Sequence, residues 1–590
     1  MKLISMRYRQ LSSLMLLLIL MAQNMNLCAQ IVWHNPLEDS SLPVQGRGWN
    51  QEIGKTYSRL PLRVKEKICK SVWNLSQESA GLYIKFHTNA ANIQVKYKVN
   101  GELSISHIPV IEGSGVDLYT MDSDGNQSWC AGRWCSFNDT IIYSYENLTY
   151  ANPHNRGNEY CLYLPLYNKV EFLQIGVPIE CRFDFVRPSL EKPIVIYGAF
   201  IAPETCTLHP SLAWTNMLQR KLDTPVINLG FSDSGQLDEK FLELIAELDA
   251  SLVIIGYMSK MTGEPIQLIK NRLKRIVQQI RRERDTPVLL VECDGYMECN
   301  ASTPKIENFI GGNKQLQVAC HLLEDSIKGL YCITLEELGL SAKSSIDVRS
   351  AEGLGIQQYV DAYAKKIKSI LYPAVDSLIF KPCRQYRDAD TYCWNVRHEE
   401  ILKYNADCQP KIVMIGNSII HYWGGMPFEK NRKADDVWQK LFNGKSVVNM
   451  GFGWDRIENM AWRIIHGELD GFKAGKVFML MGTNNLQQNS DMEIVEAISQ
   501  VVDIVKDKQK DAQLYVLNIL PRRGFEYRLN GLNHLLTNRL AGESNVQILD
   551  ISSFFLNKDG RLKEDLFSDG LHPNHKGYEI ISKELSKYLE

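Results

Sequence analysis

The C-terminal third of the chain carries the residue types that acyl transfer through a serine requires. Ser418 follows a short apolar run, and Asp569 and His572 lie near the C-terminus. A serine hydroxyl is a weak nucleophile until a neighbouring base takes its proton. The spacing Asp-x-x-His lets a short turn bring one carboxylate to the imidazole that it orients. These three residues therefore predict a serine nucleophile, a histidine base and an aspartate that orients the base.

The elements that must position these residues are strands of a parallel sheet. Residues 412–415 form an apolar run that Gly416 and Asn417 interrupt, so Ser418 is expected at the carboxyl end of a buried strand. Open α/β sheets build their sites at that edge. Two further polar blocks, GFGWD at 451–455 and GTNN at 482–485, also follow apolar runs. We expect all of these blocks to meet at one edge of the sheet.

Taken in order, the blocks GNSI, GFGWD, GTNN and DGLHP resemble those of the SGNH (GDSL-type) hydrolases. Residues 411–590 are most similar to the acetylhydrolase branch, typified by the platelet-activating-factor acetylhydrolase catalytic subunits. The resemblance implies that Ser418 is the nucleophile, His572 the base and Asp569 its partner. It also implies an oxyanion hole made by the backbone N–H groups of Ser418 and Trp454 and the side-chain amide of Asn484. The family has glycine at the position of Trp454; tryptophan keeps the N–H but changes the backbone and the room above it.

Residues beside the blocks indicate the kind of substrate. His421, Tyr422 and Trp423 directly follow the serine turn and offer ring faces and hydrogen bonds that suit a sugar. The alternative for Tyr422 and Trp423 is that they pack the core behind the serine. Asp455 and Asn485, which belong to the polar blocks, are further candidates for the substrate pocket.

These observations predict an exported serine esterase that removes short acyl groups, most simply acetyl, from carbohydrate esters without a metal or other cofactor. Its partner is a small-molecule or polysaccharide ester. A phospholipid-type or general short-chain lipid esterase is one alternative, and a glycan-binding surface protein without catalysis is another. The 66 basic and 68 acidic residues nearly balance, which argues against a nucleic-acid partner. The oligomeric state is not predicted.

The first 29 residues are typical of a secretory signal peptide. Basic residues precede the apolar run Leu14–Ala22, which is too short to span a bilayer, and cleavage is expected after Ala29. Lipidation at Cys28 is the alternative. The leader predicts a periplasmic or cell-surface location in a bacterium and no transmembrane segment. In that setting four cysteine pairs are close enough in sequence to form disulfides, although buried free thiols are expected for most: Cys130/Cys135, Cys293/Cys299, Cys320/Cys332 and Cys383/Cys393.

Residues 30–190 predict a β-sandwich. Short apolar–polar alternations such as NIQVKYKV (92–99) are separated by Gly, Asn and Asp turns, as in antiparallel sheets. The stretch resembles the N-terminal β-sandwich of some bacterial SGNH hydrolases, including WNLS at 73–76 and YLPLYN at 163–168. Four tryptophans could form a sugar-stacking surface or could pack inside the protein: Trp49, Trp73, Trp129 and Trp134.

Residues 191–372 predict a second copy of the α/β domain. PIVIYGAFI (193–201) matches KIVMIGNSI (411–419), and VINLGF (226–231) matches VVNMGF (447–452). The positions that carry the chemistry differ, because Phe200 replaces Ser418, Asp233 lies opposite Trp454, Lys260 replaces Asn484 and Ser350 replaces His572. Only Asp347 matches its counterpart, Asp569. This copy is therefore predicted to be degenerate and inactive, with Ser232 or His209 as an alternative set.

The predicted fold class is thus multidomain. A β-sandwich precedes two doubly wound, flavodoxin-like three-layer SGNH domains at 191–372 and 408–590, joined by a linker with a lead-in helix at 373–407. Short connections between the domains predict that the sandwich and the first copy form a rigid platform rather than domains that move independently.

Overall fold

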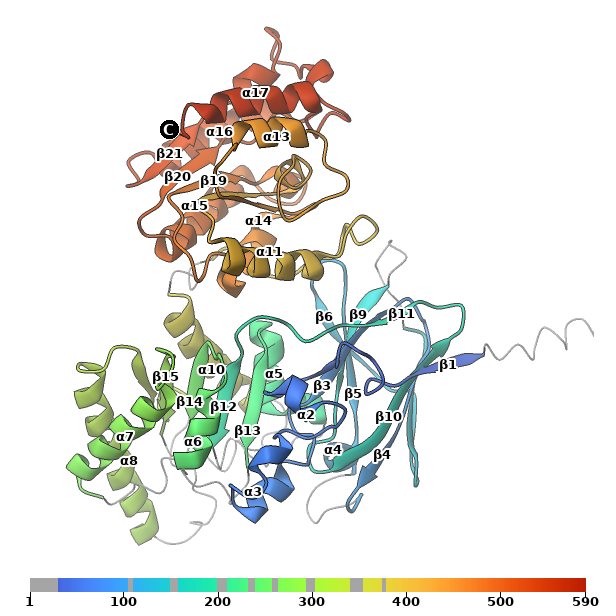
Figure 1. Ribbon diagram of the computed structural model, residues 1–590, viewed down its shortest axis with the longest axis vertical. Helices are drawn as coiled ribbons and strands as arrows, with labels where there is room; N and C mark the ends of the chain where they lie inside the picture. The colour runs from blue at the N-terminus through green and yellow to red at the C-terminus, as the bar shows by residue number, and fades with distance from the viewer. Residues whose placement is uncertain are drawn as a thin grey trace, which may run out of the picture.

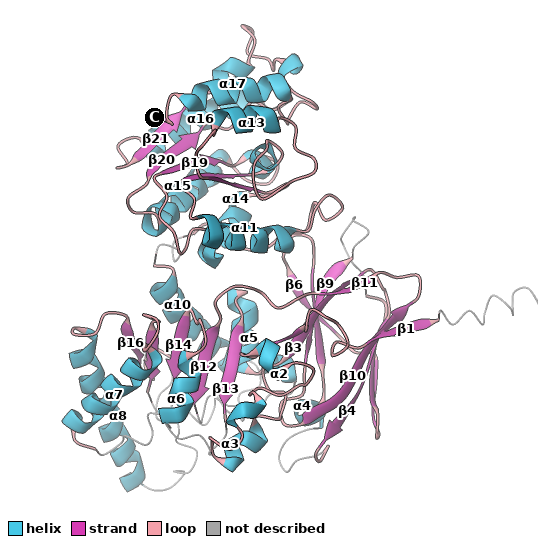
Figure 2. Cartoon of the chain, in the orientation of Figure 1, coloured by secondary structure: helices cyan, strands magenta, loops and turns pink. Residues whose placement is uncertain are grey.

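Two antiparallel sheets at the N-terminus lie beside a parallel five-stranded sheet, and a second parallel sheet lies above both (Figures 1 and 2). The computed structural model describes residues 30–589 except 104–109, 149–156, 199–208, 232–238, 257–263, 293–302, 340–353 and 374–377. The predicted signal peptide and its cleavage site lie outside the described residues. No helix in the described part of the chain is both long and apolar enough to cross a membrane.

The N-terminal domain is the predicted β-sandwich. One sheet has the order β1-β10-β4-β8-β7, and the other has the order β11-β3-β9-β5-β6 with β2 paired to β3. The alternation in β4 buries every second residue, so one face packs the core, as its sequence pattern indicates. The strands are β1 (Ile31–His34), β2 (Val44–Gln45), β3 (Tyr83–Thr88), β4 (Ile93–Asn100), β5 (Asp117–Met121), β6 (Gln127–Cys130), β7 (Trp134–Phe137), β8 (Ile141–Tyr145), β9 (Asn158–Tyr163), β10 (Lys169–Pro178) and β11 (Phe183–Phe185). Its helices are short: α2 (Asn50–Ile53), α3 (Lys70–Leu75) and α4 (Val110–Ser114).

The first copy has the parallel strand order β13-β12-β14-β15-β16, which is the flavodoxin-like order. Its strands are β12 (Ile194–Gly198), β13 (Val226–Gly230), β14 (Leu252–Ile255), β15 (Val288–Val291) and β16 (Leu330–Ile333). The helices α6 (Glu239–Ala246), α7 (Ile266–Ile280) and α8 (Thr303–Glu324) pack on one face, and α5 (Trp214–Leu222) and α10 (Leu354–Leu371) pack on the other.

The second copy repeats this order as β18-β17-β19-β20-β21. Its strands are β17 (Ile412–Gly416), β18 (Val447–Gly451), β19 (Lys476–Leu480), β20 (Gln513–Leu517) and β21 (Val546–Leu549). One face carries α11 (Trp394–Cys408), α14 (Ile457–Arg463), the π-helical turn η4 (Ile464–Glu468), α15 (Asp491–Lys508) and α16 (Glu526–Leu540). The other face carries α12 (Ser418–His421), α13 (Asp435–Leu441) and α17 (His575–Ser586). The predicted fold class is confirmed.

Each copy receives a buried arginine from the segment that precedes it. In the first copy, Arg59 of the sandwich donates to the carbonyls of Asn228 (3.3 Å) and Gly230 (3.0 Å) at the end of β13. In the second copy, Arg397 of α11 donates to the carbonyls of Asn449 (3.1 Å) and Gly451 (2.7 Å) at the end of β18. The two arginines thus donate hydrogen bonds to equivalent backbone carbonyls in the two copies.

The predicted platform has direct contacts between domains. Two of the four candidate tryptophans, Trp49 and Trp73, pack against the core of the first copy, and the Trp49 indole donates to Glu247 (2.8 Å). The other two, Trp129 and Trp134, are about half exposed at 50% and 54%. The tryptophans therefore do not form one common surface.

None of the described cysteines forms a disulfide. They include both members of three predicted pairs, Cys130/Cys135, Cys320/Cys332 and Cys383/Cys393. The fourth pair, Cys293/Cys299, lies outside the described residues.

Candidate active site

Ser418 lies at the carboxyl end of the central strand, where its sequence context places it. β17 ends at Gly416, and Asn417 caps the following short helix α12 by accepting the N–H of Ile419 (3.0 Å). Ser418 is therefore the first residue of that helix, and only 5% of its surface is exposed. At Gly451, the end of the neighbouring strand, a Cβ would lie 2.1 Å from the His421 backbone nitrogen. Glycine is required there because the turn after β18 lies directly against α12.

Ser418, His572 and Asp569 form a continuous hydrogen-bonded chain. The Ser418 Oγ lies 2.9 Å from His572 Nε2, and His572 Nδ1 lies 2.6 Å from Asp569 Oδ2. The second carboxylate oxygen of Asp569 accepts the backbone N–H groups of Leu571 (2.9 Å) and His572 (2.8 Å). The three-residue spacing thus folds into a turn in which one carboxylate holds both the ring and the backbone of the histidine.

The electrostatics of this chain favour a neutral histidine beside a charged aspartate. Burial lowers the pKa of His572 below its ordinary value of 6.5, although the Asp569 carboxylate opposes this shift. Partial burial pushes the pKa of Asp569 upward, but the hydrogen bonds from the His572 backbone and ring outweigh it and lower the pKa to about 2. At neutral pH the imidazole can therefore accept the Ser418 proton.

We predict that kcat/KM for an aryl acetate falls toward acid with a midpoint below 6.5, because protonated His572 cannot act as a base and its pKa is lowered. In Asp569→Asn the midpoint should move to still lower pH, since the lost carboxylate is the group that raises the pKa of His572. The measurement is kcat/KM from about pH 4 to 8 for both proteins. A wild-type midpoint above 6.5 would contradict the prediction.

The expected oxyanion donors are two backbone N–H groups and one amide side chain. Among the described residues, the N–H groups of Ser418 and Trp454 have no hydrogen-bond acceptor. Asn484, in the short helix η5 (Thr483–Asn485), donates from Nδ2 to the Asp455 carbonyl (2.9 Å), which ties it to the turn that contains Trp454. Donors held in this way can stabilise charge that develops on a substrate oxygen.

Trp454 adopts a left-handed backbone conformation with φ 62°. Glycine reaches this region freely, whereas other residues pay about 1–3 kcal/mol. Trp454 is 54% exposed, so burial of the side chain offsets little of that strain. Contacts of the surrounding turn must therefore maintain the conformation.

Three successive parts of the chain match known protein families. Residues 31–183 match the family GxDLY, the N-terminus of SGNH hydrolase-type esterases. Residues 191–368 and 414–580 match two families of GDSL-like lipase/acylhydrolases. The chain is an SGNH/GDSL-type acylhydrolase. It carries an N-terminal SGNH-esterase domain followed by two GDSL-like domains.

Curated relatives of this acylhydrolase include the platelet-activating factor acetylhydrolase IB subunits. The alpha2 subunits of rat and human are each 28% identical over 201 residues, which cover 33% of this chain and 83% of the relative. Among solved structures, a candidate GDSL-like lipase from Bacteroides ovatus covers 58% of this chain and 98% of its own, with 23% identity and a TM-score of 0.48. The salicylyl-acyltransferase SsfX3 of a tetracycline biosynthetic pathway covers 58% and 97%, with 15% identity and a TM-score of 0.43.

The expectation that His421, Tyr422 and Trp423 line a substrate pocket of the acylhydrolase is wrong for His421 and Trp423. Trp423 is fully buried between Trp438 and Tyr578, with ring centroids 5.4 and 5.3 Å away. His421 is also buried, accepts the N–H of Gly453 at Nδ1 (3.0 Å), and has a pKa lowered to about 3 by burial. His421 is therefore neutral and holds the turn at Gly453 from its buried side.

Tyr422 is the member of this group that lies beside the reacting atoms. It is half-buried, and its ring centroid lies 6.0 Å from that of His572. Its hydroxyl donates to the Asp388 carboxylate (2.6 Å). Asp388 belongs to the linker, and no sequence motif marked it as a neighbour of the site.

The two remaining pocket candidates are buried as well. Asp455 accepts from Arg463 (2.8 Å) and from the Trp394 indole (2.8 Å), so its carboxylate faces the core. Asn485 accepts the N–H of Ile457 (3.1 Å), and its amide also donates to Glu458 (3.0 Å). Both residues hold the polar blocks together, and neither is available to a substrate.

The site positions of the first GDSL-like copy lie outside the described residues. This applies to Phe200, Asp233, Lys260, Ser350 and Asp347, and also to the alternative nucleophile Ser232. His209 is described, and its Nδ1 lies 3.1 Å from a carboxylate oxygen of Asp117 in the sandwich. The inactivity of this copy remains a prediction.

Proposed function

We propose that the second copy is a serine esterase that removes short acyl groups, most simply acetyl, from carbohydrate esters. The observation that carries the proposal is the Ser418–His572–Asp569 chain, with its 2.9 and 2.6 Å contacts at the carboxyl edge of the sheet. Ser418, Asp569 and His572 are the proposed catalytic residues. The proposed oxyanion donors are the N–H groups of Ser418 and Trp454 and the amide of Asn484.

The reaction follows from the geometry. The Ser418 oxygen bonds to the acyl carbon while its proton passes to His572 Nε2, and the carbonyl oxygen becomes an oxyanion among the three donors. The oxyanion collapses, the ester C–O bond breaks, and the leaving alcohol takes the proton from His572. Water then repeats the sequence on the acyl-enzyme and releases the acid.

Three features support the substrate class. The relatives that act as acetylhydrolases suggest a short acyl group. The Tyr422 ring and the Asp388 carboxylate lie next to His572 and offer a ring face and a hydrogen-bond acceptor to a sugar alcohol. The predicted leader supports export to the periplasm or cell surface, where polymeric glycans are met.

A lipid ester is the second candidate because of two exposed apolar side chains after the nucleophile helix. Met426 is 46% exposed and Phe428 is 57% exposed. Such side chains suit an acyl chain or a lipid surface. The same residues would then perform the same chemistry on a longer substrate.

We predict that an aryl-ester series with two, four and eight acyl carbons is turned over fastest at two carbons. Each excess methylene in a closed pocket costs about 1–3 kcal/mol, so the four-carbon ester should still react slowly. Trp454→Gly, which removes the bulk next to the oxyanion donors, should raise the eight-carbon rate relative to acetate. If the wild type prefers the eight-carbon ester, the acetylesterase proposal fails and the lipid candidate replaces it.

A further inference from the structure

The turn that contains Trp454 is held by residues from outside the second copy. The Gly453 carbonyl accepts from Gln385 Nε2 (2.9 Å) and from the Tyr392 hydroxyl (2.9 Å). The Trp454 carbonyl accepts from Arg387 Nη2 (3.1 Å). All three donors belong to the linker. Linker side chains thus bind the carbonyls of Gly453 and Trp454, which lie on either side of the Trp454 N–H. They thereby hold Trp454 itself, the residue with the strained backbone.

Arg387 is in turn held by the sandwich. Its Nη1 lies 2.6 Å from Asp124 Oδ1 in the turn between β5 and β6, and its Nη2 also donates to Asn459 Oδ1 (2.5 Å). The backbone makes a parallel contact, because the Tyr386 N–H donates to the Ser123 carbonyl (2.8 Å). Asp124 has one more basic neighbour, Arg456, at 3.5 Å. A continuous path therefore runs from the sandwich through Arg387 to the Trp454 peptide.

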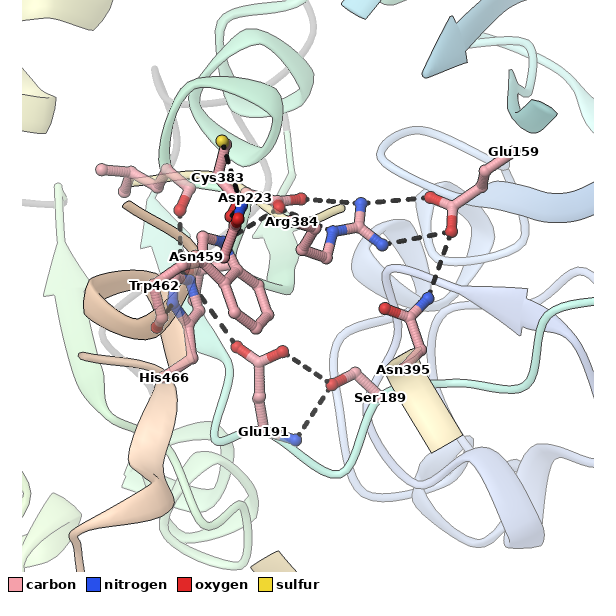
Figure 3. Close-up of polar contacts among 12 residues, drawn as sticks. Glu159, Ser189, Glu191, Asp223, Cys383, Arg384, Asn395, Asn459, Trp462 and His466 are labelled. Atoms are coloured by element: carbon pink, nitrogen blue, oxygen red, sulfur yellow. Dashed lines mark hydrogen bonds and ion pairs between the residues drawn. The ribbon is translucent and has the colours of Figure 1, made fainter. Parts of the chain in front are cut away.

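A second linker arginine, Arg384, anchors this segment to both N-terminal domains (Figure 3). Arg384 is buried and lies 3.1 Å from Glu159 of the sandwich and 2.7 Å from Asp223 of the first copy. Asp223 also accepts the indole N–H of Trp462 in the second copy (3.1 Å). With one arginine in contact with both domains, the linker cannot shift without breaking buried ion pairs.

We propose that Arg387 is a positioning residue for the oxyanion hole and that Asp124 of the sandwich positions Arg387. The inference rests on the proposed function of the second copy. It assigns the N-terminal domains a part in catalysis: they keep the Trp454 N–H aimed at the substrate oxygen.

The test uses the full chain with Arg387→Ala, Arg387→Lys and Asp124→Asn, and with Asp139→Asn as the matched control. Asp139 is an exposed sandwich aspartate in the turn between β7 and β8, and it forms an ion pair with Lys98 of β4 (2.7 Å). Each protein is assayed with an aryl acetate for kcat and KM, and is titrated with an aryl trifluoromethyl ketone. This ketone forms an oxyanion on the serine, so its affinity reports the oxyanion hole directly.

Loss of an oxyanion donor lowers kcat by about 100- to 1000-fold, and a misaimed donor should cost less, about 10- to 100-fold. We expect that fall in kcat for Arg387→Ala, with KM changed less than about two-fold and ketone affinity reduced by the same factor as kcat. Arg387→Lys should rescue little, because one ammonium cannot bind Asp124 and the Trp454 carbonyl together as the planar fork does. Asp124→Asn should fall between wild type and Arg387→Ala, and Asp139→Asn should match wild type.

The inference is overturned if kcat and ketone affinity of Arg387→Ala and Asp124→Asn stay within about two-fold of wild type while Ser418→Ala is inactive. A rise in KM with unchanged kcat would also overturn it. Full activity of Ser418→Ala would instead refute the proposed function. Should Arg387→Ala fail to fold, Asp124→Asn decides, since it keeps the size of a half-exposed side chain.

Discussion

Ser418→Ala is expected to lower kcat for an aryl acetate by several orders of magnitude, on the order of 10⁴- to 10⁶-fold, as removal of a triad nucleophile does in other hydrolases. The Ser418 Oγ is the atom bonded to His572 Nε2, and no other described hydroxyl makes that contact. The side chain loses a single oxygen, so the fold should persist. The measurement is the initial rate on purified protein, with circular dichroism to verify the fold.

Ser499→Ala provides the matched control for this variant. Ser499 is a buried serine of the same domain on α15, with 2% of its surface exposed, and it lies on the helix that covers the sheet. Its substitution should leave kcat within about two-fold of wild type. Substantial activity in Ser418→Ala would refute the assignment of the nucleophile.

The largest loss of stability is expected for Arg463→Leu. Arg463 is fully buried, lies 2.8 Å from Asp455, and also forms an ion pair with Glu468. Its removal leaves two carboxylates without their cation, and breaking a buried pair costs about 3–5 kcal/mol. For a domain of this size that corresponds to a fall of roughly 6–20 °C in Tm.

This fall is measured as the temperature at which esterase activity is lost in the full chain. Arg539→Leu is the control, because Arg539 forms a similar pair with Glu496 (2.9 Å) on the exposed face of two helices. Exposed pairs contribute about 0–1 kcal/mol, so this control should shift Tm by at most a few degrees. Equal shifts in Tm for the two variants would mean that the buried ion pair contributes no more to stability than the exposed one.

Features that depend on local patterns could be predicted from the sequence. The period of apolar residues predicts α15 at 491–508, where the structure has it, and the apolar runs predict the strands of both copies. Three polar blocks at strand ends and a fourth before the last helix predict that Ser418 and His572 meet, because a parallel sheet brings its carboxyl ends to one edge.

Features that depend on distant contacts could not be predicted. Residue type alone does not tell whether Trp423 faces a pocket or the core, and the structure buries it. The helical period of residues 491–508 predicts Gln500 on the exposed face of α15, yet it is buried and accepts the N–H of Ile379 from the linker (2.8 Å). Gln385 and Arg387 lie in a segment without periodicity, and their roles become visible only when the chain closes around the turn at Trp454.

The paired arginines at the two strand ends have a consequence for where the second domain begins. Arg59 reaches β13 from a complete sandwich domain, whereas Arg397 reaches β18 from a single helix that is continuous with the second copy. In the second copy one helix thus supplies the contact that the sandwich supplies in the first. A fragment that starts at residue 408 would lose Arg397 and leave the carbonyls of Asn449 and Gly451 without their donor. By this criterion the smallest independent unit begins before Trp394, inside what the sequence marks as a linker.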